Sequence, residues 1–118
     1  MLLAVPAMLL LAAALPLRAD VTGTWTASFD TQIGVQNYTY VFQVDGGKLT
    51  GTAKSQFGET EITEGTVKGD AIRFVENLEF QGQPLKIVYT GTIKGDEIQF
   101  NRKVGDVASE DFVAKRSK

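Results

Sequence analysis

The ten residues Gly91–Phe100, GTIKGDEIQF, decide the fold class because they place apolar side chains at every second position on both sides of a turn. In the turn itself, Gly95 stands beside Asp96. This pair supplies the positive φ that a tight β-hairpin demands. A similar stretch, GTVKGDAIRF, occupies Gly65–Phe74. The repeated hairpin corner predicts antiparallel strands of similar geometry around a barrel.

The same alternation by two recurs along the chain from Asp20 onward, whereas no stretch of a dozen residues keeps helical spacing. Turn residues separate the alternating runs, and the longest connection is expected at Thr31–Asn37. An open sheet of this size would expose two edges, and closing it removes them. We therefore predict an all-β fold, an eight-stranded antiparallel up-and-down β-barrel, or meander. The expected strands lie at about 22–30, 38–45, 48–55, 60–68, 71–80, 85–94, 97–104 and 108–116.

The two faces of these strands differ in chemistry. The expected interior holds Trp25, Tyr40, Phe42, Leu49, Phe74, Ile87, Tyr89, Phe100 and Phe112. The opposite face carries Lys54, Lys68, Arg73, Glu79, Lys86, Glu97, Gln99 and Lys103. A transmembrane barrel needs an apolar outward band, so the charged outer face favours a water-soluble barrel. Barrels of this size are either filled by side chains or hold one small ligand, and the pattern leaves both open.

The N-terminal residues 1–19 have a composition of their own. They are rich in Leu and Ala, carry Pro6 and Pro16, and contain one charged side chain, Arg18. The segment is too short and too interrupted for a membrane span, but it fits a signal peptide cleaved after the small residue Ala19. We expect residues 20–118 to form the barrel domain and to be secreted or periplasmic. An uncleaved N-terminal anchor is the alternative.

The amino-acid composition argues against several classes of function. The formal net charge is −2 and basic residues are interspersed with acids, so we expect neither nucleic acid nor anionic lipid as a partner. The absence of His and Cys removes the usual general base, thiol catalysis and the common zinc ligands. The turn aspartates lack the dense spacing of a calcium loop. We therefore expect no metal, no cofactor and no catalysis. An enzyme would require a buried acid with a strongly raised pKa inside a cleft.

Five residues are the candidates for contacting a ligand: Tyr38, Tyr40, Tyr89, Glu76 and Arg102. Glu76 lies two residues after Phe74, and Arg102 lies two residues after Phe100, so both could face the interior as these phenylalanines do. A buried pair of opposite charges sometimes marks a ligand pocket. Because both lie near strand ends, they could instead reach the barrel mouth and stay hydrated. The tyrosines offer an apolar plate with a hydroxyl, and the alternative is that they are core.

The segment Gly23-Thr24-Trp25 resembles the Gly-x-Trp signature of the calycin superfamily, which includes the lipocalins and avidins. The resemblance implies that Trp25 closes one end of the barrel and that an arginine of the last strand packs across it. Arg116 has the matching inward parity. GGKLTGT at Gly46–Thr52 is similar to the opening hairpins of a streptavidin-type barrel. Trp25 is the only tryptophan, so biotin binding is not implied.

The running pattern of GTW, GGKLTGT, YTG-x-I-x-GDEI and a terminal F-x-AKR is similar to small exported bacterial barrel domains, some of them attached to secreted carbohydrate-processing proteins. We expect a non-catalytic binding module for a small apolar or amphipathic molecule at the open mouth. The alternative is a structural or protein-interaction module with a filled core, whose partner is another exported protein.

Overall fold

The structure is a computed structural model that describes residues 20–117; the expected signal peptide, residues 1–19, and Lys118 lie outside the described residues. The described chain forms nine strands: β1 (Gly23–Thr31), β2 (Gly34–Asp45), β3 (Lys48–Ser55), β4 (Gly58–Glu61), β5 (Thr63–Lys68), β6 (Ala71–Phe80), β7 (Gln83–Lys94), β8 (Glu97–Val104) and β9 (Ala108–Arg116). All pairings between them are antiparallel.

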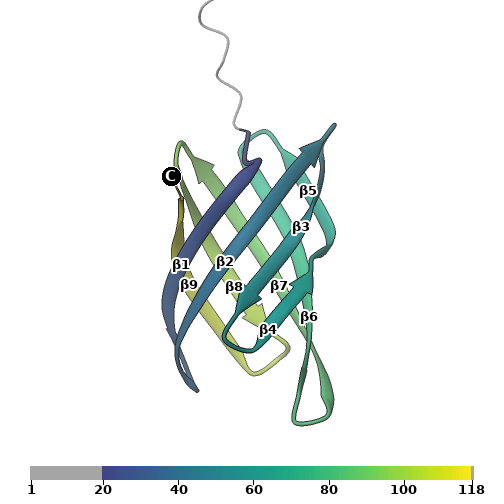
Figure 1. Ribbon diagram of the computed structural model, residues 1–118, viewed down its shortest axis with the longest axis vertical. Helices are drawn as coiled ribbons and strands as arrows, with labels where there is room; N and C mark the ends of the chain where they lie inside the picture. The colour runs from purple at the N-terminus through teal and green to yellow at the C-terminus, as the bar shows by residue number, and fades with distance from the viewer. Residues whose placement is uncertain (1–19, 118) are drawn as a thin grey trace, which may run out of the picture.

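The strands close into an eight-stranded barrel in meander order, as the sequence predicts (Figure 1). The short strands β4 and β5 together take one place in the barrel, because both pair with β3. The seam between the first and last strands is short, with Trp25 opposite Arg116 and Thr26 opposite Lys115. Within residues 20–117, no helix is long and apolar enough to cross a membrane.

The expected interior and exterior are confirmed. All nine predicted interior residues are buried, and the eight predicted outer residues are exposed. Contacts between aromatic rings run through the interior, including the stacked pairs Phe74–Tyr89 and Phe29–Phe112. The barrel is therefore packed through its middle by aromatic rings.

The predicted strand 60–68 is divided in two at Ile62. The Ile62 amide donates to the Gly51 carbonyl at 3.0 Å, so the backbone stays bonded to β3 through the break. Beyond it, the β5–β6 register shifts between Thr63 and Thr66. Gly51 permits the close approach of β2, because a Cβ there would collide with the carbonyl oxygen of Val41. The irregularity bends the sheet where the barrel must curve.

The prediction of a long connection at Thr31–Asn37 is wrong. The segment is a hairpin in which only Gln32 and Ile33 lie between β1 and β2. The Thr31 side chain closes this turn, since its Oγ1 accepts from the Ile33 amide at 3.1 Å and donates to the Gly34 carbonyl at 2.8 Å. This Thr-x-x-Gly turn lacks the Gly-Asp pair found in the turns at Gly69, Gly95 and Gly105, and side-chain hydrogen bonds stabilise it instead.

Candidate functional site

The end of the barrel that contains Trp25 is closed. Trp25 is fully buried, and its indole Nε1 donates to the Val21 carbonyl at 2.9 Å. The Arg116 guanidinium lies over the indole, with Cζ 4.5 Å from the ring centroid. The structure therefore places the guanidinium where the resemblance implies it, on the face of the indole.

Arg116 also ties the two ends of the chain together. Its Nη1 and Nη2 donate to the carbonyls of Thr22 and Asp20 at 3.1 and 2.9 Å, and its Nε donates to Asp96 Oδ1 at 2.9 Å. Gly23 lies beneath it at φ +134°, where a Cβ would come within 3.3 Å of Nη1. This end is thus sealed by an ordered arginine rather than left open.

The five candidate ligand residues come together inside the barrel in one hydrogen-bonded network. Tyr38 and Tyr89 each donate to the Glu76 carboxylate, at 3.0 and 2.7 Å. Tyr40 donates to the Tyr89 hydroxyl at 3.1 Å. Arg102 donates from Nε to Tyr89 and from Nη2 to Tyr38, at 3.0 and 3.1 Å. These side chains occupy alternate positions that face the barrel interior on four strands, β2, β6, β7 and β8.

Both charged members of the network are buried, so the alternative in which they stay hydrated at the strand ends is wrong. Glu76 is 1% exposed and Arg102 is 5% exposed. Arg102 has a closer carboxylate than Glu76, because its Nη1 donates to Glu110 Oε1 at 2.7 Å while Nη2 stands 4.0 Å from Glu76 Oε1. Aromatic rings of Phe29, Tyr38 and Tyr89 lie 5.3, 5.3 and 5.7 Å from the guanidinium carbon.

Burial shifts the titration of the network. It raises the pKa of Glu76 above its ordinary value, against the opposing effects of the Tyr89 hydrogen bond, the Arg102 charge and the Tyr38 hydrogen bond. It also raises the pKa of Tyr38 to about 12 and those of Tyr40 and Tyr89 well above their ordinary value. Burial alone would lower the pKa of Arg102, but the surrounding oxygens raise it, so the guanidinium stays charged.

The opposite end of the barrel opens into a cavity of about 670 Å³. The exposed fraction of the lining side chains decreases from the rim of the cavity to its floor. Gln36, Tyr38, Ile87 and Arg102 are buried and form the floor. The hairpin tips form the rim, and Phe57 and Val107 there are 59% and 67% exposed. In Figure 1 these tips lie at the lower end, away from the N-terminal start of β1.

The cavity reaches some of the candidate residues and not others. Tyr38 and Arg102 line it. Tyr40, Tyr89 and Glu76 do not, so they support the floor from below. Several polar lining residues were not among the candidates from the sequence, and Gln36 and Glu110 are the two nearest the floor. Glu110 could have been found from its parity with Phe112, whereas Gln36 fell within the segment that was expected to be a loop.

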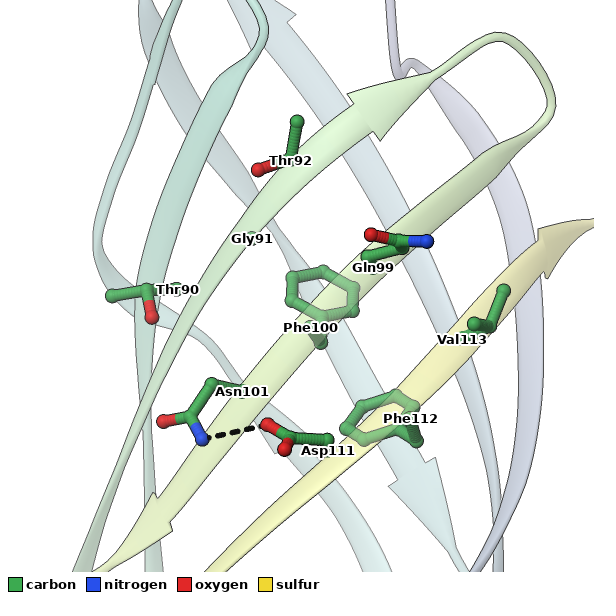
Figure 2. Close-up of a pocket in the computed structure, with 9 residues that line it drawn as sticks. All are labelled: Thr90, Gly91, Thr92, Gln99, Phe100, Asn101, Asp111, Phe112 and Val113. Atoms are coloured by element: carbon green, nitrogen blue, oxygen red, sulfur yellow. Dashed lines mark hydrogen bonds between the residues drawn. The ribbon is translucent and has the colours of Figure 1, made fainter.

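A second, shallow hollow lies on the outer face over β7, β8 and β9 (Figure 2). Gly91 contributes only backbone to it, because a Cβ there would point inward and come within 2.7 Å of the buried Phe100 ring. The polar groups at its edge satisfy one another, since Asn101 Nδ2 donates to Asp111 Oδ1 at 2.9 Å. No charged side chain is buried in it. The cavity at the open mouth is the stronger candidate site.

Comparison with known protein families, curated proteins and solved structures found no match to this chain. The structure itself shows a closed eight-stranded antiparallel barrel, which is compatible with a calycin-like fold. The likeness to exported bacterial domains stays a prediction.

Proposed function

We propose that this chain is an exported, non-catalytic binding module that holds a small apolar or amphipathic molecule in the open mouth of the barrel. The observation that carries the proposal is the cavity of about 670 Å³, with a buried polar floor beneath an apolar rim. Small-molecule sites commonly occupy about 300–1,000 Å³ and combine an apolar lining with a few polar groups.

The lining suits an amphipathic guest. Its apolar part includes Ile33, Leu78, Phe80, Leu85 and Val104, contributed by four separate strands or turns. Burying an alkyl chain against these side chains is favourable by roughly 0.8 kcal/mol per CH₂. The polar atoms of the floor can then orient one end of the guest.

The proposal includes no reaction. Burial raises the pKa of Glu76, which is one property of a catalytic acid, but Glu76 does not line the cavity and a guest there does not reach it. Within residues 20–117, no three metal-binding side chains gather into a possible metal site.

Titration with N-phenyl-1-naphthylamine, an uncharged fluorophore that brightens in apolar surroundings, tests the proposal. We expect saturable binding of one molecule per chain, and loss of binding in Ala108→Trp, because Ala108 lines the cavity. Ala71→Trp is the matched control, since Ala71 is exposed and outside the cavity. Equal binding by wild type and Ala108→Trp, or no binding at all, would contradict the proposal.

The exposed rim supports a second candidate function, a protein-interaction module. Ile33, Phe57 and Val107 are large apolar side chains exposed at the tips of separate hairpins. Apolar surface of this kind is typical of interfaces. If the rim binds protein, a partner co-purified from the native host should be lost in Phe57→Ser. Retention of the partner by Phe57→Ser would argue against this role.

Export is tested separately by the mass of the protein recovered from its host. A chain that begins at Asp20 indicates cleavage after Ala19. The intact chain in the membrane fraction would indicate the anchor instead.

A further inference from the structure

The polar groups of the cavity lining differ in how far other protein groups already satisfy them. Arg102 is the only cation among the lining residues, and its Nε, Nη1 and Nη2 all donate within the protein. Its nearest carboxylate, Glu110, also lines the cavity. The cavity therefore offers a cation whose charge is already matched.

The carboxylates exceed the cations here. Glu110 lies 2.7 Å from Arg102, and the Glu76 carboxylate stands behind the floor at 4.0 Å from the same guanidinium. Glu79 is a further acid, exposed at the rim of the cavity. An anionic group entering the cavity would lose hydration without gaining an unpaired positive charge, and it would approach these acids.

A cationic head group meets the opposite obstacle. To reach the floor, the cation must approach the Arg102 guanidinium, which stays charged. The Glu110 carboxylate is already paired with that guanidinium. The nearby rings of Phe29 and Tyr38 already face Arg102, so they do not form an empty cage for a second cation.

Gln36 is the floor residue with hydrogen-bonding capacity left over. It is 3% exposed and lines the cavity, and none of the side-chain hydrogen bonds among residues 20–117 involves its amide group. Every fully buried polar side-chain atom of the described residues has a partner. The Gln36 amide must therefore face the cavity, where it presents one acceptor oxygen and two donor hydrogens.

We propose that the guest of this cavity is an amphiphile with an uncharged hydrogen-bonding head group, such as an alcohol, ester or amide, which binds Gln36 at the floor while its apolar tail lies toward the rim. This inference rests on the proposed binding function. It adds that head-group charge, of either sign, is selected against.

Three single-chain probes of equal length separate the possibilities: decanol, decanoate and decylamine. The assay measures how well each probe displaces the bound fluorophore from the full-length protein at neutral pH. We expect decanol to bind about tenfold tighter than either charged probe, because desolvating an unmatched charge costs more than one hydrogen bond returns. If decanoate or decylamine binds as tightly as decanol, the inference fails although the binding function stands. If none of the three displaces the fluorophore, the inference fails, and the fluorophore titration alone decides the binding function.

Glu110→Gln gives a sharper test, because it keeps a hydrogen-bond acceptor for Arg102 and removes the matching charge. We expect decanoate to bind about tenfold tighter to this variant than to wild type, and decanol affinity to change little. Glu61→Gln is the matched control, since Glu61 is exposed and outside the cavity. No gain for decanoate in Glu110→Gln would overturn the claim that Glu110 neutralises the floor.

Gln36→Leu tests the head-group contact itself. We expect about a tenfold loss of decanol affinity, because the hydroxyl then enters the floor without a partner. Gln43→Leu, on the outer face of the same strand, is the control. Circular dichroism of each variant checks that the barrel is formed. Unchanged decanol affinity in a folded Gln36→Leu protein would overturn the assignment of Gln36.

Discussion

Replacing Arg102 by Met removes the cation of the buried network while keeping much of the unbranched stem. The variant loses three hydrogen bonds, of 3.0, 2.7 and 3.1 Å, to Tyr89, Glu110 and Tyr38. It also leaves Glu76, which is 1% exposed, without its nearby positive charge. Breaking a buried ion pair at one partner costs about 3–5 kcal/mol, and we expect a loss in that range.

Glu76→Gln in the same background identifies the cause. If the loss comes from an uncompensated carboxylate, the double variant should be more stable than Arg102→Met alone by about 1–3 kcal/mol. Arg102→Met should also recover as pH falls, by up to about 1.4 kcal/mol per pH unit, because Glu76 can then bind a proton.

The assay is urea unfolding followed by the fluorescence of Trp25, the only tryptophan. Arg73→Met is the matched control, because Arg73 is on the outer face with only a 3.9 Å pair to the exposed Glu64. We expect it to cost less than about 1 kcal/mol. A loss below about 1 kcal/mol for Arg102→Met, or strictly additive effects with Glu76→Gln, would refute the reasoning.

Further predictions concern the closed end and the titrations. In urea unfolding followed by circular dichroism, Trp25→Ala should cost about 3–5 kcal/mol, and Arg116→Ala should cost less and lose most of its effect in the Trp25→Ala background. Additive losses would show that the two residues do not interact. In an absorbance titration after rapid pH jumps, the folded protein should form no tyrosinate near pH 10, and Tyr38 should ionise at about 12; ionisation near 10 would show accessible phenols. Since burial raises the pKa of Glu76, the folded state binds its proton more tightly than the unfolded state does. The contribution of Glu76 to the free energy of unfolding is therefore fully present below its unfolded pKa and is lost as pH rises through its folded pKa. Glu76→Gln should remove this pH dependence of the free energy of unfolding. Parallel pH profiles of wild type and Glu76→Gln would contradict this.

The sequence predicted the barrel well because strand periodicity is local and strict. Alternation by two placed Glu76 and Arg102 on the inward face, where the structure has them. It also placed Trp25 and Arg116 on inward positions of the first and last strands, which barrel closure brings opposite each other.

The remaining features depend on register and turn chemistry that alternation does not encode. The pairing of Arg102 with Glu110 follows from their opposite positions on β8 and β9, and the sequence alone did not rank Glu110 above Glu76 as the partner. Gln36 was not predicted to line the interior, because the segment Thr31–Asn37 was expected to be a connection between strands. The contact between Asp96 and Arg116 also depends on closure of the barrel, which brings the last strand to the exposed Asp96 side chain.

The central claim, that function resides at the mouth opposite Trp25, is tested most directly by mapping methyl chemical shifts in NMR spectra on addition of decanol. The account predicts that the largest shifts fall on the cavity methyls of Leu78, Leu85 and Val104, and that those of Val21 and Ile98 near the closed end stay unchanged. Shifts centred on the closed end or on Val113 of the outer hollow, or no shifts at saturating decanol, would contradict it.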